Sequence, residues 1–151
     1  MRCFPAVAFA CAFAAPIAAP AQPYGPELVV EGFLDAFRAG DLDAIVSLHA
    51  PDASWLPTTG GPRLDGQDAI RGYYQRVFAN TRARSITPSN ERWQPLGDDV
   101  AVRSADIRID QEATDGRALV TLARLTAVYR RDEAGGWSIV HQHSCQQQAA
   151  R

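Results

Sequence analysis

Two histidines, His141 and His143, stand two residues apart in a stretch, Trp137–Gln146, whose side chains alternate as in a β-strand. Residues two apart on a strand point to the same side, so the two imidazoles share one face. Three roles are open for them. One histidine could act as a general acid or base, because its ordinary pKa is near neutral. The pair could bind a metal with His49 or Asp52 as a further ligand, or it could pack at an interface.

The same alternation predicts which residues accompany the histidines on each face of this strand. One face carries Trp137, Ile139, His141, His143 and Cys145, and the other carries Ser138, Val140, Gln142 and Ser144. A slip of one residue would exchange the two faces, so the sequence leaves open which of them meets a pocket.

Arg124 is the second candidate for chemistry, because it stands among the apolar residues Val120, Leu122 and Val128 of its predicted strand. A buried arginine needs a carboxylate or an anionic ligand. The predicted partner is either a ligand carboxylate or phosphate, or a neighbouring acid such as Asp106 or Glu91.

Three aromatic residues, Trp55, Tyr73 and Tyr74, are predicted to line a pocket. A tyrosine hydroxyl in a dry cavity can polarise a carbonyl oxygen, but such chemistry also needs a base. Asp106 and Asp52 are the carboxylates that could supply it. Aromatic residues at this spacing also form ordinary helix cores, so both roles stay open for them.

Several function classes are excluded by what the sequence lacks. All 15 basic residues are arginine, so Schiff-base chemistry on lysine is excluded. The net charge is −2 and no basic stripe is present, which argues against nucleic-acid binding. No phosphate loop, metal motif, nucleophile elbow or dinucleotide fingerprint occurs, so neither a cofactor nor a metal is predicted.

The first 21 residues have the features of a secretory signal peptide: Arg2, then an apolar run, then the small residues Ala19 and Ala21 around Pro20. We expect one domain over residues 22–151, located in the periplasm or secreted, with no membrane attachment after cleavage. Removal of the leader would leave Cys145 as the single cysteine, which cannot form an internal disulfide.

The elements that must position these residues follow from the hydrophobic period. Apolar residues at helical spacing predict helices over residues 27–39, 41–49 and 67–80. Alternating patterns predict strands over 53–56, 84–94, 100–110, 118–131 and 137–146, joined mostly by hairpin turns. Helices followed by a run of hairpin-linked strands indicate an α+β fold with an antiparallel sheet and a ligand cavity between the layers.

Three segments carry a family likeness: FLDAFRAGDLDAIVSLHAPDASWL, LDGQDAIRGYYQRVF and ARLTAVYRRDEAGGWSIVHQHSC. They resemble the nuclear-transport-factor-2-like, or SnoaL-like, superfamily, and the last is similar to SgcJ/EcaC-type members and to the association domain of calcium/calmodulin-dependent protein kinase II. The resemblance implies a cone-shaped curved antiparallel sheet wrapped around three N-terminal helices, often dimeric through the outer sheet face. It also implies that Ser144 points into the cavity. Kinase association domains carry an arginine there, so their function is not implied.

Three functions are therefore expected as alternatives. The first is an exported small-molecule-binding module whose ligand contacts are Trp55, Tyr73, Tyr74, Arg124, Gln142 and Ser144. The second is a cofactor-independent isomerase or lyase that transfers a proton through His143, His141 or Asp106. The third is an assembly domain. The expected partners are a small molecule and a second copy of the chain.

Overall fold

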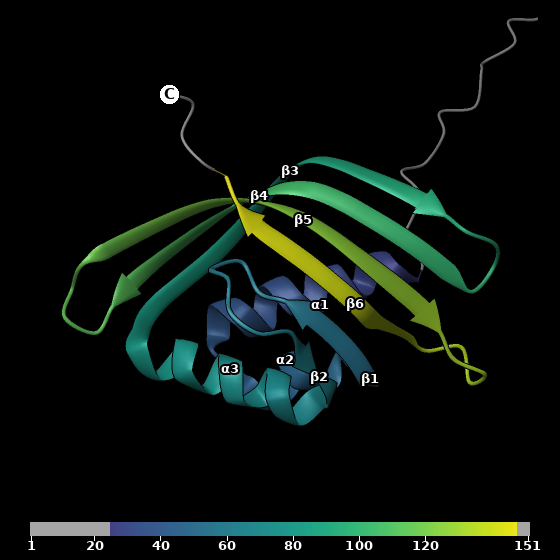
Figure 1. Ribbon diagram of the computed structural model, residues 1–151, viewed down its shortest axis with the longest axis horizontal. Helices are drawn as coiled ribbons and strands as arrows, with labels where there is room; N and C mark the ends of the chain where they lie inside the picture. Colours follow the sequence, from purple (N-terminus) through teal and green to yellow (C-terminus); the bar gives the residue numbers. More distant parts are fainter. Residues whose placement is uncertain (1–24, 148–151) are drawn as a thin grey trace, which may run out of the picture.

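The computed structural model describes residues 25–147, and the predicted leader over residues 1–21 lies outside the described residues. The helices are α1 (Pro26–Ala39), α2 (Leu42–Ser47) and α3 (Gly66–Asn80). The strands are β1 (His49–Leu56), β2 (Leu64–Asp65), β3 (Thr81–Pro95), β4 (Val100–Ala113), β5 (Ala118–Arg131) and β6 (Trp137–Gln146) (Figure 1). No helix in this part of the chain is long and apolar enough to cross a membrane.

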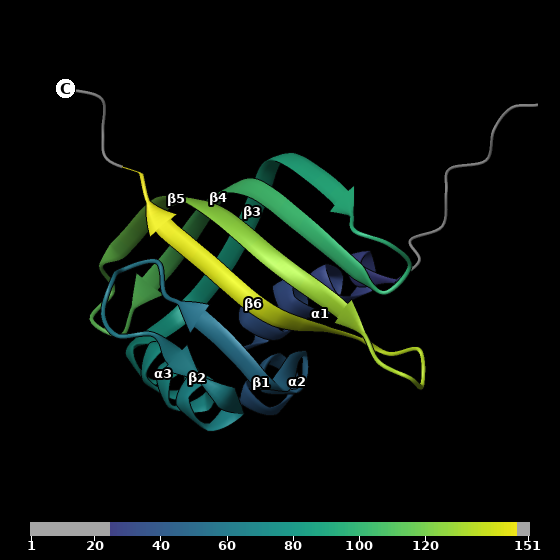
Figure 2. The ribbon, with the colours of Figure 1, turned by 45° about the vertical axis from the view of Figure 1, so that its right-hand side comes forward.

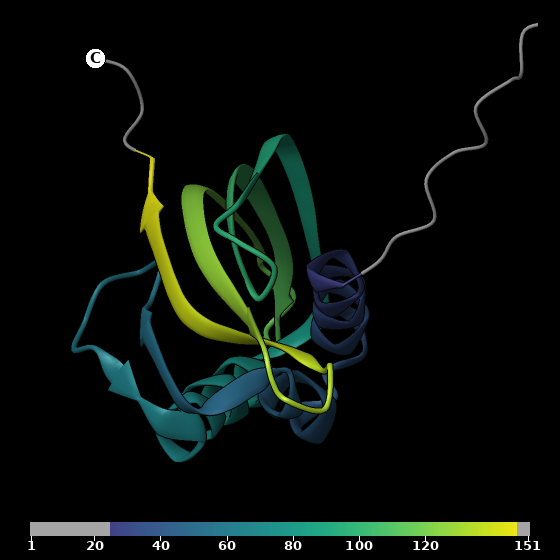
Figure 3. The same cartoon turned by 90° about the vertical axis from the view of Figure 1, so that its right-hand side faces the viewer.

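The strands form one six-stranded sheet in the order β2-β1-β6-β5-β4-β3. The sheet curves around the helices, which all lie on its concave side (Figure 3). This arrangement confirms the predicted α+β fold with a curved sheet and three N-terminal helices. Four of the strand pairs are antiparallel, whereas β1 runs parallel to β6. Figure 2 shows β1 and β6 side by side, although they lie far apart in the sequence.

The second helix is shorter than the sequence predicts, because β1 takes its last residues. The expected helix over residues 41–49 ends at Ser47, and His49 already pairs with Ile139 of β6. The backbone N–H of Ile139 donates to the Leu48 carbonyl at 2.9 Å, so sheet pairing competes successfully with the last helical turn. The two-residue strand β2 was not predicted, because a segment of two residues is too short to show an alternation of apolar and polar side chains.

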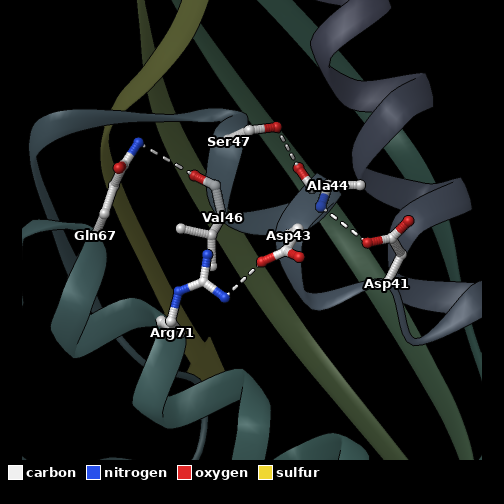
Figure 4. Close-up of polar contacts among 7 residues, drawn as sticks. All are labelled: Asp41, Asp43, Ala44, Val46, Ser47, Gln67 and Arg71. Carbon is white, nitrogen blue, oxygen red and sulfur yellow. Dashed lines mark hydrogen bonds and ion pairs between the residues drawn. The ribbon is translucent and has the colours of Figure 1, made fainter.

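A side-chain cap begins α2, and an exposed ion pair joins α2 to α3 (Figure 4). The side chain of Asp41 accepts a hydrogen bond from the backbone N–H of Ala44 at 2.9 Å, which satisfies a free donor at the helix start. Arg71 of α3 donates to Asp43 of α2 at 2.7 Å. Gly40 closes α1 in the left-handed conformation at φ 73°, as the Gly-Asp junction predicted.

A β-bulge in β6 decides the direction of every side chain that follows it. Val128 pairs with His141 and Tyr129 pairs with Ile139, so Val140 is an extra residue in β6. The alternation therefore changes phase at this point. Ile139 faces the helices, but His141 does not, and the predicted unbroken face from Trp137 to Cys145 is wrong.

Two buried clusters of apolar residues hold the layers together. One joins the helices to β1 and contains Phe37, Ile45, Ala53, Trp55, Ile70 and Tyr74. The other covers the concave face of the sheet and contains Val29, Ala105, Leu125, Ala127, Tyr129 and Ile139. Phe33, Ile86 and Ile109 pack against both clusters, and the space between the clusters is the candidate site.

Candidate ligand-binding site

A cavity of about 90 Å³ lies between the helices and the concave face of the sheet. Its walls are mainly apolar and aromatic. Helix α1 contributes Val30, Phe33, Leu34 and Phe37, α3 contributes Tyr73, Tyr74 and Val77, and the sheet contributes Trp55, Ile86, Ile107, Ile109, Leu125, Tyr129 and Ile139. The remaining lining residues are polar: Thr58, Thr59, Arg103, Gln111, Thr121 and Gln142.

The cavity wall contains no aspartate, glutamate or histidine among the residues that the structure describes. General acid–base catalysis needs a titratable group within hydrogen-bond reach of the reacting atom. Among residues 25–147, Arg103 is the single charged residue in this wall, and an arginine stays protonated at any physiological pH. The other titratable groups of the wall are Tyr73, Tyr74 and Tyr129, whose hydroxyls can bind and polarise a ligand.

Pairing between strands places two of the polar lining residues, Arg103 and Gln142, in one row across the sheet. Arg103 pairs with Trp93 of β3 and Ala127 of β5, Ala127 pairs with Gln142 of β6, and Gln142 pairs with Trp55 of β1. Paired residues point to the same face, so Arg103 and Gln142 approach the cavity from two strands apart.

Arg103 is nearly inaccessible to solvent, with 4% of its surface exposed. Its Nε donates to Oε2 of Glu91 at 2.7 Å, while its Nη2 is buried without a hydrogen-bond partner among residues 25–147. The guanidinium carbon lies 5.9 Å from the ring centroid of Trp93. Burial raises the pKa of the neighbouring Tyr129, and Arg103 opposes that rise.

The predicted aromatic residues form one packed group at the cavity. Trp55 stacks on Tyr74 with ring centroids 5.3 Å apart, and Tyr73 meets Trp55 edge-on at 4.6 Å. Burial raises the pKa of Tyr73, and it raises that of Tyr74 well above the ordinary value. Both hydroxyls therefore stay protonated at neutral pH and can donate hydrogen bonds to a ligand.

Of the two predicted ligand contacts on β6, Gln142 lies in the cavity wall and Ser144 is buried beside it. The Ser144 hydroxyl shares a 2.7 Å hydrogen bond with Thr58 and accepts a longer one of 3.5 Å from Nε1 of Trp55. Ser144 therefore acts on the site through Thr58 and Trp55, which both line the cavity.

The residues proposed for proton transfer lie outside the cavity. After the bulge, His141 and His143 point to the outer face of the sheet, where His143 is exposed and Nδ1 of His141 shares a 2.9 Å hydrogen bond with the Ser54 hydroxyl. Asp106 also faces outward and accepts hydrogen bonds from Asn90 at 2.7 Å and Gln147 at 3.0 Å. This placement corrects the prediction that these three residues meet a pocket.

Arg124 was predicted to be buried, and this prediction is wrong. Arg124 is exposed on the outer face of β5, and Val120 and Leu122 on the same face are also 52% and 47% exposed. The buried arginine is Arg103. The sequence contained an indication of this burial, because Arg103 lies on the same face of its strand as Ala101, Ala105, Ile107 and Ile109.

His49 is buried behind the cavity, with 2% of its surface exposed. Its Nδ1 bonds to the Ile45 carbonyl at 2.9 Å, and its Nε2 has no partner among the described residues. Burial lowers the pKa of His49 to about 4. In residues 25–147 no three histidine, cysteine or acidic side chains are grouped as a metal site requires, and His49 lies apart from the outer histidines.

The chain matches the SnoaL-like domain family over residues 27–147. This match spans most of the sequence, so the chain belongs to the SnoaL-like domain family, whose fold is that of nuclear transport factor 2. No curated protein matches the sequence.

Solved structures agree with this fold. A protein from Xanthomonas campestris, assigned as a calcium/calmodulin-dependent protein kinase II association domain, has a TM-score of 0.77 at 23% identity and covers 89% of this chain and 95% of its own. An NTF2-like superfamily protein from Salmonella enterica has a TM-score of 0.72 at 19% identity, covering 82% and 89%. A ketosteroid isomerase-like protein from Erwinia carotovora scores 0.70 at 16% identity, covering 81% and 93%. At these identities the likeness concerns the fold.

Proposed function

We propose that this protein is a small-molecule-binding domain that holds its ligand in the cavity between α1, α3 and the sheet. The observation that carries the proposal is the composition of the cavity wall. Aromatic and aliphatic side chains enclose the space, a few polar groups converge on it, and no carboxylate or imidazole of residues 25–147 lines it. A preformed apolar cavity with a small number of polar contacts is the usual form of a ligand site.

The alternative of a cofactor-independent isomerase or lyase has weaker support. The tyrosine hydroxyls of Tyr73 and Tyr74 could polarise a carbonyl, but proton transfer also needs a base. His141, His143 and Asp106 lie on the outer face of the sheet, and Nε2 of His49 is fully buried. Binding therefore accounts for the cavity better than catalysis does.

Blocking the cavity tests this function. Val77 of α3 lines the cavity, so Val77→Phe should fill it, whereas Val120→Phe on the outer face of β5 should leave it open. We expect small aromatic compounds to raise the melting temperature of the wild type and of Val120→Phe, but not that of Val77→Phe, because a ligand stabilises the state that binds it. Shifts that persist in Val77→Phe, or no shift in the wild type with any compound of fitting size, would contradict the proposal.

Export from the cytoplasm is part of the same proposal, supported by the signal-peptide pattern of residues 1–21. N-terminal sequencing of protein recovered from the periplasm or the medium should begin near Gln22. Recovery of the protein in the cytoplasm with Met1 retained would contradict export.

A further inference from the structure

We infer that the cavity ligand is a small monocarboxylate with an apolar body, held through its carboxylate by Arg103. The inference rests on the proposed function, because it names the ligand class for the same cavity. The apolar body would contact the aromatic wall, and the amide of Gln142 would supply a second polar contact.

The hydrogen bonds of Arg103 are incomplete. Its Nε is satisfied by Glu91 at 2.7 Å, but Nη2 is buried and has no partner among residues 25–147. A buried charged donor without an acceptor destabilises the protein, so a ligand that brings an acceptor removes this penalty. A carboxylate is the matching group, because its two oxygens fit the planar fork of the guanidinium.

The charge balance limits the ligand to a single negative charge. Glu91 already accompanies Arg103, and its side chain is 37% exposed, so water still solvates that carboxylate. A monoanion in the cavity could share the guanidinium with Glu91. A dianion such as phosphate would leave excess negative charge in an apolar space, which costs free energy.

The cavity volume limits the size of the ligand. About 90 Å³ is available, and one water-sized group occupies roughly 10–15 Å³, which leaves room for about six to nine non-hydrogen atoms. Gln142 lies in the same row as Arg103 with Ala127 between them. Their backbones are roughly 9–10 Å apart, since neighbouring strands are about 4.8 Å apart. Arg103 and Gln142 both line the cavity, so a short carboxylate bound at Arg103 can extend through it toward Gln142.

Benzoate and benzamide form a matched pair of probes for this inference. They have the same shape and number of non-hydrogen atoms, at the upper end of the predicted range, and differ in charge. Calorimetric titration of the full mature protein should show that benzoate binds at least about tenfold more tightly than benzamide. A hydrogen bond to a charged group contributes enough binding free energy for a difference of this size. Equal affinity for the two probes, or no binding of either, would overturn the carboxylate assignment.

Three variants identify the anchor. Arg103→Met should weaken benzoate binding by about tenfold or more and leave benzamide binding within about twofold. Met is similar in volume to Arg, and the side chain of Glu91 is 37% exposed, so its carboxylate keeps contact with water when the guanidinium is removed. The control Arg124→Met changes the same residue type on the outer face of the neighbouring strand and should leave both affinities unchanged.

Glu91→Gln removes the competing negative charge and should strengthen benzoate binding several-fold, without affecting benzamide binding.

The outcomes separate this inference from the proposed function. Benzamide binding that Val77→Phe abolishes, combined with benzoate binding that Arg103→Met and Glu91→Gln leave unchanged, would overturn the carboxylate anchor while the cavity remained a binding site. Failure of both probes, together with failure of other compounds of fitting size, would overturn the binding function as well.

Discussion

His49 is an uncharged histidine inside the helix layer. Its ring lies 6.2 Å from that of Phe33 and 6.4 Å from that of Tyr74, measured between centroids. The Ile45 carbonyl can only accept, so Nδ1 carries the proton and Nε2 is an unprotonated acceptor. Protonation would place a charge among apolar side chains, and this desolvation is why the pKa of His49 falls to about 4.

This shift predicts a loss of stability in acid. The unfolded chain binds a proton at His49 below its ordinary pKa of 6.5, whereas the folded chain does so only below about 4. Stability is therefore unaffected by His49 above pH 6.5 and decreases as the pH falls toward 4, by about 2 kcal/mol at pH 5. Urea unfolding at pH 7.5 and pH 5.0 should show this decrease in the wild type and a smaller one in His49→Asn, which keeps a donor for the Ile45 carbonyl. An identical pH dependence in the variant would contradict the assignment.

Arg103 and Arg124 show what residue patterns could and could not predict about the site. Both arginines lie on strands that were correctly predicted, and each has apolar neighbours at alternate positions. The residues in phase with Arg103 are Ala101, Ala105 and Ile107, which are buried, whereas those in phase with Arg124 are partly exposed. Both patterns look alike in sequence, because hydrophobicity alone does not say whether a strand face meets a core or an open surface.

At the scale of elements, the bulge in β6 explains why the strand was predicted and its faces were not. The boundaries of β6 agree with the alternation, but Val140 is an extra residue opposite Val128 and Tyr129. Such an insertion leaves no distinct mark in a sequence of alternating residues, and it reverses every side chain beyond it. For this reason Gln142 reaches the cavity and His143 does not.

The change of phase predicts opposite reactivity for thiols at two adjacent positions. In protein that begins at Gln22, exposed Cys145 should react readily with a thiol reagent in the folded state. In the double variant Ser144→Cys, Cys145→Ser, the thiol replaces a side chain that is 2% exposed, so it should react roughly a hundredfold more slowly until the protein unfolds. Comparable rates for the two proteins under native conditions would show that the faces of β6 are assigned wrongly.

At the scale of the whole molecule, the sequence contained enough to predict the architecture but not the lining of the cavity. The helices, the hairpins and the family likeness together predict the curved sheet over three helices, because each of them can be recognised from a local sequence pattern. The cavity depends on contacts between distant segments. Its wall combines α1, α3 and strands from both ends of the sheet, including the parallel pairing of β1 with β6.

The outer face of the sheet leads to the last prediction, that two copies of the chain associate through it. Val120 and Leu122 are 52% and 47% exposed on β5, a strand in the interior of the sheet, where a second copy could cover them. We expect the wild type to be a dimer at micromolar concentrations by light scattering and Leu122→Glu to be a monomer, because a charged side chain would replace an apolar one on the face that the second copy covers. Leu96→Glu is the matched control, since Leu96 is 52% exposed in the turn between β3 and β4 and should leave the dimer intact. A monomeric wild type, or dissociation by both changes alike, would exclude this face as the interface.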